Sequence, residues 1–183
     1  MTEGRASRGT TRIEPTDATA GFSSGVHTID DYFARHAVPN DTVGVNRAYV
    51  LRRRAEDEAT LPPILGFYTL SMANEESSVL EKVLGRKLPK YPSPVALIGR
   101  LAVDQRVQRR GVGEVLLVDA LRRIQQAADV VGCVGTIVDA KNESAARFYA
   151  KYGFVDVEGD GCWPQRLFLS LRRTPNHTML PEE

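Results

Sequence analysis

The alternation of apolar and polar positions in the first half of the chain predicts three strands. They cover residues 12–15, 46–54 and 64–72. A charged turn over residues 56–63, which ends in two prolines, separates the second strand from the third, and such an arrangement is typical of an antiparallel hairpin. One helix, over residues 28–37, is expected between the first strand and the second.

The helix at residues 28–37 has sequence signals at both ends. Thr28 is the expected N-cap, and two acidic residues follow it in the first turn, where they favour the helix dipole. Pro39 and Asn40 come directly after the last apolar position. Because proline disrupts a helix interior, we expect the helix to end before them.

In the second half of the chain the apolar positions change to a helical period. Apolar residues recur on one face of a helix over residues 111–128, between an apolar strand at 95–103 and a short strand at 133–138. Such a unit is normally a right-handed crossover between parallel strands. Further elements are expected at residues 142–152 (a helix), 154–157 and 166–171 (strands). The pattern predicts an α/β fold with a mixed, mostly antiparallel sheet and helices on its faces.

Residues 74–94 look like an insertion between two strands. A short helix is expected over residues 77–84, ending near Gly85. This is the most basic stretch between the strands, with Lys82, Arg86, Lys87 and Lys90.

The composition is that of an ordinary globular domain. The 183 residues are 42% hydrophobic and 26% charged, which suits one domain with a full core. We place the domain at residues 12–173, between a polar leader (1–11) that we expect to be disordered and a polar tail (174–183). The net charge of +1 does not by itself indicate binding to nucleic acid, so any basic patch that binds it must be local.

Several classes of protein do not fit the sequence. No stretch approaches the roughly 18 apolar residues of a membrane span, and no apolar run after the N-terminal arginines suggests a secretory signal. Cys133 and Cys162 form no CxxC motif, so a cytoplasmic protein with reduced thiols is expected. The three histidines show no metal-ligand spacing, and we expect no metal.

A glycine-containing loop, Gln108-x-x-Gly111-x-Gly113, stands between the strand at 95–103 and the long helix. Helix N-termini expose N–H groups and the positive end of the dipole, which bind anions, and glycines let a diphosphate approach the backbone. Neighbouring arginines add positive charge. The alternative is that the glycines only permit tight packing and the arginines are solvated.

Two segments resemble the signatures of the GNAT superfamily of N-acetyltransferases. Residues 99–104, with 108–113 shortly after them, resemble its central motif. Residues 142–154 resemble its second signature, N-x-x-A-x-x-F-Y-x-K-x-G-F. The two occur in the family's order, about thirty residues apart.

The resemblance implies the GNAT fold and acetyl-CoA as co-substrate. In this family the strand before the loop pairs with pantetheine, and backbone N–H groups of the loop hold the pyrophosphate. The implied cofactor-binding residues are Leu101, Ala102, Val103, Gln108, Arg109, Arg110, Gly111, Val112, Gly113, Glu114, Asn142 and Ser144. From the residues alone, Asn142 is equally well an N-cap.

Tyr149 matches the tyrosine that GNAT enzymes commonly use as general acid, which would protonate the departing CoA thiolate. The alternative is a core aromatic, although Phe148 and Tyr152, four apart on one helical face, look more like the core pair. No carboxylate stands out as a general base; Glu75, Glu76 and Asp104 are candidates without positional support. An α-amino acceptor has a pKa of about 7.7–8.0, so it loses its proton without a strong base more readily than a lysine side chain, whose pKa is near 10.4.

A closer resemblance concerns the acceptor. Residues 22–25, 30–37, 44–50, 66–70 and 99–104 resemble the GNAT-type toxins of bacterial toxin–antitoxin modules. Members of that group acetylate the α-amine of aminoacyl-tRNA, which blocks translation, and are neutralised by an antitoxin that is often a ribbon–helix–helix protein. The resemblance therefore implies charged tRNA and a cognate antitoxin as partners, and it is in keeping with a homodimer.

Binding of tRNA predicts a basic surface near the thioester, because phosphate contacts supply most non-specific affinity. The candidates are Arg86, Lys87, Lys90 and Arg100, with a second cluster at residues 52–54. For any single one of them, a solvated charged face is the simpler interpretation. Two other functions stay open: a GNAT enzyme acting on a small-molecule amine or a protein N-terminus, and a CoA-binding module without catalysis.

Overall fold

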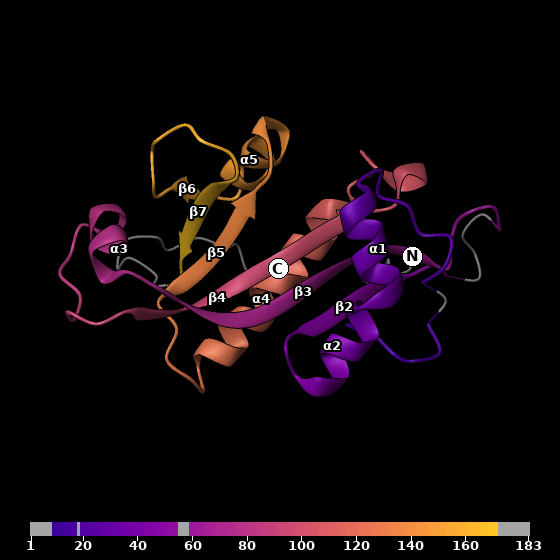
Figure 1. Cartoon of the computed structure of the whole chain (residues 1–183), viewed down its shortest axis with the longest axis horizontal. Helices are drawn as coiled ribbons and strands as arrows, with labels where there is room; N and C mark the ends of the chain where they lie inside the picture. Colours follow the sequence, from indigo (N-terminus) through magenta and orange to yellow (C-terminus); the bar gives the residue numbers. More distant parts are fainter. Residues whose placement is uncertain (1–8, 18, 55–58, 172–183) are drawn as a thin grey trace, which may run out of the picture. The chain divides into compact units, whose positions relative to one another are not determined.

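The structure is a computed structural model that describes residues 9–17, 19–54 and 59–171. Its strands form one sheet in the order β1-β2-β3-β4-β5-β7-β6, mostly antiparallel with one parallel pair, which confirms the predicted mixed sheet. The strands are β1 (Thr11–Arg12), β2 (Arg47–Arg52), β3 (Ile64–Glu75), β4 (Ser93–Val103), β5 (Gly135–Ala140), β6 (Val155–Asp156) and β7 (Gln165–Ser170). The helices are α1 (His27–Arg35), α2 (Ala37–Val43), α3 (Ser77–Leu84), the 3-10 helix η1 (Gln105–Val107), α4 (Val112–Ala128) and α5 (Glu143–Ala150) (Figure 1).

The described residues form two compact units, to which β3, β4 and α4 each contribute in part. The first contains the residues up to Ser71 together with Ile98–Arg123, and the second contains Met72–Leu97 and the residues from Ile124 on.

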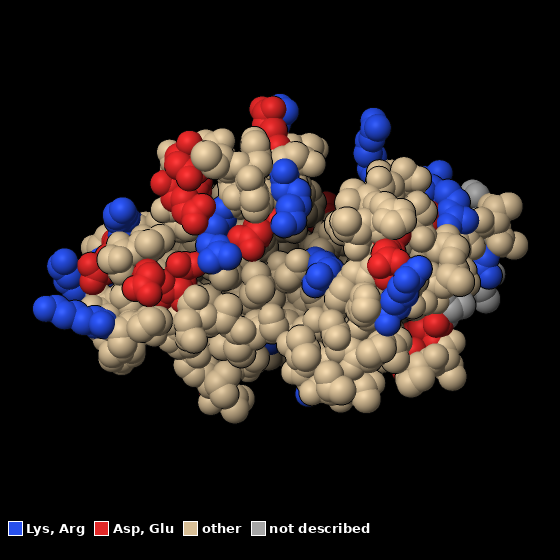
Figure 2. Space-filling model, in the orientation of Figure 1, with Lys and Arg blue, Asp and Glu red and all other residues tan. Residues whose placement is uncertain are grey.

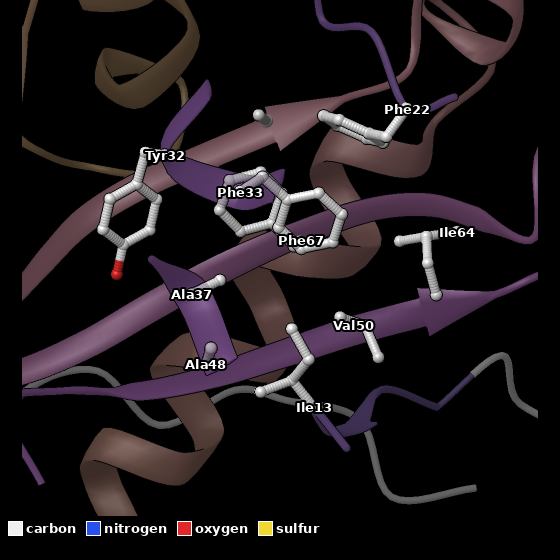
Figure 3. Packing of buried hydrophobic residues seen from close by; sticks show 10 residues of the cluster. Ile13, Phe22, Tyr32, Phe33, Ala37, Ala48, Val50, Ile64 and Phe67 are labelled. Carbon is white, nitrogen blue, oxygen red and sulfur yellow. The ribbon is translucent and has the colours of Figure 1, made fainter. Parts of the chain in front are cut away.

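The core of the first unit is an aromatic cluster between the two N-terminal helices and the strands β2 and β3 (Figure 3). The rings of Phe33 on α1 and Phe67 on β3 stack with centroids 4.1 Å apart, and Phe22 meets Phe67 edge-on at 5.5 Å. Consecutive residues of a strand point to opposite faces. Gly66, next to Phe67, therefore faces the other way, where a Cβ atom would lie 2.8 Å from Leu116 of α4. The sheet thus has helices on both faces in this unit.

The boundary between the first two helices differs from the prediction. The residue preceding α1 is Val26, without a side-chain cap, so Thr28 is not the N-cap. Pro39 and Asn40 do not end the helical region either; they lie inside α2. Pro39 is the third residue of that helix, where its missing N–H would have had no intrahelical partner.

The start of the described chain is anchored by a polar cluster. Thr10 and Tyr68 donate hydrogen bonds to the carboxylate of Asp119 on α4, the latter over 2.5 Å, and Arg123 pairs with the same oxygen at 3.0 Å. Thr11, at the end of the predicted leader, lies in β1, which pairs with β2. Residues 1–8 of that leader and the tail at 174–183 lie outside the described residues.

The second unit is built on the antiparallel strands β5, β7 and β6. Leu80 of α3, Val95, Ile137, Val157 and Phe168 form its buried core. The predicted helix at residues 77–84 is confirmed, and Gly85 follows it in the left-handed region at φ 62°. Within the described residues, no helix is long and apolar enough to cross a membrane.

Candidate active site

The loop between β4 and α4 has the backbone of an anion site. Residues 108–111 are exposed, and two of them, Arg109 at φ 59° and Gly111 at φ 82°, adopt the left-handed conformation. Among the described residues the N–H groups of Arg109 and Arg110 have no hydrogen-bond partner. The first N–H groups of α4, from Val112, add to them because a helix cannot satisfy its own first turn. The loop therefore offers N–H donors and positive charge to a diphosphate.

Strand β4 leads into this loop with alternating faces. Ala102 is 5% exposed and belongs to the aromatic core, whereas Leu101 and Val103 are half-buried. The side-chain amide of Gln108 donates to the carbonyls of Val103 and Ser24, each at 3.0 Å. Gln108 therefore shapes the loop through its side chain.

Asp104, a candidate base, is committed to other partners. Its side chain is fully buried and accepts hydrogen bonds from the guanidinium of Arg106 at 2.8 and 2.9 Å and from the N–H of Ser23 at 3.0 Å. Burial raises the pKa of a carboxyl, but these hydrogen bonds outweigh it and hold the pKa of Asp104 below its ordinary value. A carboxylate so held is a poor proton acceptor.

Glu75 is also engaged, in the second unit. Arg166 of β7 pairs with Glu75 at 3.0 Å and with Asp139 of β5 at 2.9 Å. The hydrogen bonds that Arg166 donates to Asp139, together with the charges of Asp139 and Glu75, raise the pKa of the Arg166 guanidinium. Neither Glu75 nor Asp104 is placed as a free general base.

Helix α5 carries the candidate acid. It begins at the predicted N-cap, because the side chain of Asn142 accepts a hydrogen bond from the N–H of Ala145 at 3.0 Å. Ser144, in the first turn, is exposed. The predicted core pair is wrong: Phe148 and Tyr152 are half-buried, and Tyr149 is the buried aromatic, 8% exposed.

The hydroxyl of Tyr149 is set apart from other polar groups. Its ring packs edge-on against Phe148 and tilted against Phe154, with centroids 5.2 and 5.4 Å away. No hydrogen bond joins its hydroxyl to another described residue. Burial raises the pKa of Tyr149 to about 12. The phenol is therefore protonated at neutral pH and has a proton to donate.

The candidate substrate residues differ in setting. In the first unit, the guanidinium of Arg100 lies 3.6 Å from the ring centroid of Tyr32, whose hydroxyl accepts a hydrogen bond from Asn46 at 2.8 Å. In the second unit, Lys87 pairs with Glu81 at 3.4 Å, and Lys90 is exposed. One terminal nitrogen of Arg86 is buried and has no hydrogen-bond partner in the described structure. On the face shown in Figure 2, basic and acidic side chains are interleaved around α3.

The predicted site residues thus fall into two groups. Arg100 and the β4 and loop residues belong to the first unit, whereas Tyr149, Asn142 and Ser144 belong to the second. Sequence reasoning missed Ser23 as a partner of Asp104 and Tyr32 as the partner of Arg100, because each lies far away in sequence. No group of three or more potential metal ligands occurs among the residues that the structure describes.

Known proteins share both the sequence and this architecture. The family model "Acetyltransferase (GNAT) family" matches residues 25–154. A tRNA-acetylating toxin from Mycobacterium tuberculosis (strain ATCC 25618 / H37Rv) is 36% identical over 143 residues, which is 78% of this chain and 81% of the relative.

Three solved structures are similar as well. A mutant of KacT superimposes with a TM-score of 0.75 at 30% identity, covering 88% of this chain and 95% of that one. AtaT complexed with acetyl-methionyl-tRNA gives 0.77 at 27% identity, with 88% and 93% covered. A tyrosine-to-phenylalanine mutant of the AtaT toxin, bound to the C-terminus of the antitoxin AtaR and to acetyl-CoA, gives 0.68 at 25% identity, with 88% and 91% covered.

The family model covers more than half of the chain, and the toxin relative exceeds 30% identity over more than two thirds of it. With the loop ahead of α4 and the tyrosine of α5 in the places that the two signatures predict, the chain belongs to the GNAT family of acetyltransferases.

Proposed function

We propose that this protein transfers the acetyl group of acetyl-CoA to the α-amino group of an aminoacyl-tRNA and thereby acts as a translation-blocking toxin. The observation that carries the proposal is the 36% identity, over 78% of the chain, to a tRNA-acetylating toxin. The AtaT complex with acetyl-methionyl-tRNA supports the same acceptor, since it shares the fold at 27% identity.

The loop before α4 is the proposed binding site for the pyrophosphate of acetyl-CoA, the acetyl donor. Its unpartnered N–H groups and the dipole of α4 suit the pyrophosphate of acetyl-CoA, and Arg109 and Arg110 add charge beside it. We assign Leu101 and Val103 of β4 to the pantetheine, with Asn142 and Ser144 as contacts from the start of α5. The AtaT structure that contains acetyl-CoA supports this donor.

Tyr149 is the proposed general acid. When the acceptor amine attacks the thioester carbonyl, the C–N bond forms, the C–S bond breaks, and the CoA thiolate leaves. The protonated phenol of Tyr149 gives its proton to the sulfur, and the proton that the nitrogen loses as the amide forms passes to solvent, from which the phenolate is protonated again. Its burial and its free hydroxyl suit this role, because no competing hydrogen bond among the described residues has to be broken first.

The chain needs no strong base if the acceptor is an α-amine. Such a group has a pKa of about 7.7–8.0, so a useful fraction is neutral at pH 7. The engagement of Asp104 and Glu75 in ion pairs favours this acceptor over a lysine side chain, which would require a base.

Arg100 is the basic residue best suited to the tRNA. Stacking on Tyr32 fixes the plane of its guanidinium and leaves the N–H groups at its rim for phosphate oxygens. Arg86, Lys87 and Lys90 are secondary candidates. The partner proposed for control is an antitoxin, in line with the AtaT–AtaR structure, and the family resemblance adds the ribbon–helix–helix type as a further proposal. We place the protein in the cytoplasm, where charged tRNA is found, and we propose that it forms a homodimer, as the family resemblance implies.

The test is CoA release by the purified protein with four acceptors: charged tRNA, the same tRNA after deacylation, free amino acids, and a peptide with a free N-terminus. The proposal predicts release only with charged tRNA. Release with the amino acids or the peptide but not with charged tRNA would favour an acetyltransferase of small amines or protein N-termini. Absence of release with every amine would leave a CoA-binding module without catalysis.

A further inference from the structure

Two short segments of the first unit are joined by hydrogen bonds in both directions. The segment at residues 21–25 precedes α1, and the segment at residues 104–108 leads from β4 into the loop before α4. The hydrogen-bonded residues of the two segments are 81 to 85 positions apart in the sequence. The N–H of Gln105 donates to the carbonyl of Ser23 at 2.8 Å, and the N–H of Ser23 donates to the carboxylate of Asp104 at 3.0 Å. We call these two segments the clamp.

The centre of the clamp is the buried Asp104. Besides Ser23, it accepts hydrogen bonds from the N–H and the guanidinium of Arg106. That guanidinium also donates to the carbonyl of Gly21 at 2.6 Å, so it bridges both segments. The side-chain amide of Gln108, the residue before Arg109, also donates to the carbonyl of Ser24. The clamp therefore ends where the unpartnered N–H groups of the loop begin.

The other side of the clamp is fixed to α1. The carboxylate of Asp30 in the first turn of that helix accepts from the N–H of Ser24 at 2.8 Å and from the hydroxyls of Ser24 and Ser23 at 2.6 and 3.2 Å. Gly25 adopts a left-handed conformation at φ 86°, which is strained for any residue with a side chain, and a Cβ atom there would also displace the end of the Gln105 side chain. The segment is thus held from both sides.

A loop that binds an anion through its backbone gains affinity when its binding conformation exists beforehand. The loop also contains a strained residue, because Arg109 adopts a left-handed conformation that is unfavourable for a residue other than glycine. Such a conformation persists only where its surroundings determine it. Gln108, the neighbour of Arg109, is the last residue of the clamp.

We infer that Asp104 and Arg106, through the clamp, are positioning residues that hold the loop in the conformation that binds the pyrophosphate of acetyl-CoA. This inference rests on the proposed use of acetyl-CoA. Neither side chain needs to touch the cofactor. Loss of the clamp should weaken the binding of the donor and leave the transfer step at saturating donor unchanged.

The experiment is titration calorimetry of full-length protein with CoA, beside steady-state kinetics with acetyl-CoA and a thermal unfolding curve for each variant. The test variant is Asp104→Asn. The matched control is Asp41→Asn, since Asp41 is equally a buried carboxylate held by an arginine, Arg12, and by a backbone N–H, that of Ala48, outside the clamp. Gly25→Ala is a second test variant, which disturbs the clamp from its other side.

We expect Asp104→Asn to weaken CoA binding about tenfold or more and to raise KM for acetyl-CoA by a similar factor, with kcat changed less than about twofold. Asp41→Asn should lower the melting temperature but keep wild-type affinity for CoA. Equal CoA affinity of wild type and Asp104→Asn, or an equal loss in the control, would overturn the inference. If Asp104→Asn does not fold, Gly25→Ala decides: wild-type affinity in that variant overturns the inference. Failure of the wild type to bind CoA would instead refute the proposed function.

Discussion

The central carbon of the Arg100 guanidinium lies over the ring of Tyr32, 3.6 Å from its centroid, near the end of β4 that leads to the loop before α4. Tyr32 is 6% exposed and its hydroxyl is held by Asn46, so the aromatic platform is rigid. A stacked arginine can offer a fixed row of donors to a phosphate, which a flexible lysine cannot.

Replacement of Arg100 should therefore separate acceptor binding from donor binding. We expect Arg100→Ala to lower kcat/KM for charged tRNA about tenfold and Arg100→Lys to recover only part of it, because the charge returns without the stacking. The affinity for CoA should not change. Arg35→Ala, which removes an exposed arginine of α1 paired with Asp31, is the control and should behave as wild type. Equal activity of Arg100→Ala and wild type would exclude Arg100 from the acceptor site.

The pH dependence of the transfer should be set by the acceptor and not by Tyr149. Burial raises the pKa of Tyr149 to about 12, so its neutral form, the one that donates a proton, persists throughout the accessible range. The rate should rise as the pH passes through about 7.7–8.0, where the α-amine loses its proton, and stay level to about pH 10. A fall in kcat between about pH 8 and 10, absent in Tyr149→Phe, would contradict the raised pKa.

Tyr149→Phe removes only the proton donor. We expect kcat to fall about a hundredfold or more, within the range found for general acids, while the affinity for CoA and the melting temperature remain. Loss of growth inhibition on expression should accompany it. Phe148→Leu, which alters the neighbouring half-buried ring, is the control for packing. Undiminished growth inhibition by Tyr149→Phe would refute the acid assignment.

Because Arg109 adopts a left-handed conformation, we expect glycine at this position to give a more stable protein than alanine. In most positions alanine is favoured over glycine, because glycine has more conformational freedom to lose on folding. At φ 59° the order reverses, so Arg109→Gly should have a free energy of unfolding about 1 kcal/mol larger than Arg109→Ala. Both variants lack the guanidinium, so the difference isolates the backbone. Denaturant unfolding measures it, and a more stable alanine variant would show that the residue is not strained.

Asn142 can be tested as a cap and as a donor contact with two variants. Asn142→Ala should lower the free energy of unfolding by about 1 kcal/mol, because the N–H of Ala145 loses its acceptor. Asn142→Asp should keep the wild-type stability, because its carboxylate can accept the same hydrogen bond. If Asn142 also contacts the donor, the added negative charge should weaken CoA binding in Asn142→Asp. Unchanged stability in Asn142→Ala would contradict the cap.

The elements that could be predicted from the sequence are those whose own pattern determines them. The periodic apolar stripe of α4 and the N-cap of α5 are local, and both were predicted within a residue or two. Helix α2 was missed because a proline is tolerated in the first turn of a new helix, and the sequence does not show where that helix begins. Tyr149 is buried and Phe148 only half-buried, contrary to the expected core pair, because burial depends on which strands the helix packs against.

The candidate site was predicted through its motifs, and its supporting contacts were not. Asp104 follows an apolar strand and carries no local sign that its partner is Ser23, 81 residues earlier. The stacking of Arg100 on Tyr32 likewise requires the fold to bring α1 and β4 together. Such pairs are determined by tertiary packing, which no local pattern encodes.

Acetylation of aminoacyl-tRNA is tested most directly by mass spectrometry of the aminoacyl-adenosine released by nuclease. Total charged tRNA is incubated with acetyl-CoA and the wild-type protein or Tyr149→Phe, then digested. We expect one or a few aminoacyl-adenosines to carry an added acetyl group on the α-nitrogen with the wild type, and none with the variant. Unmodified aminoacyl-adenosines, together with acetylated peptides or amines in the same reaction, would contradict it.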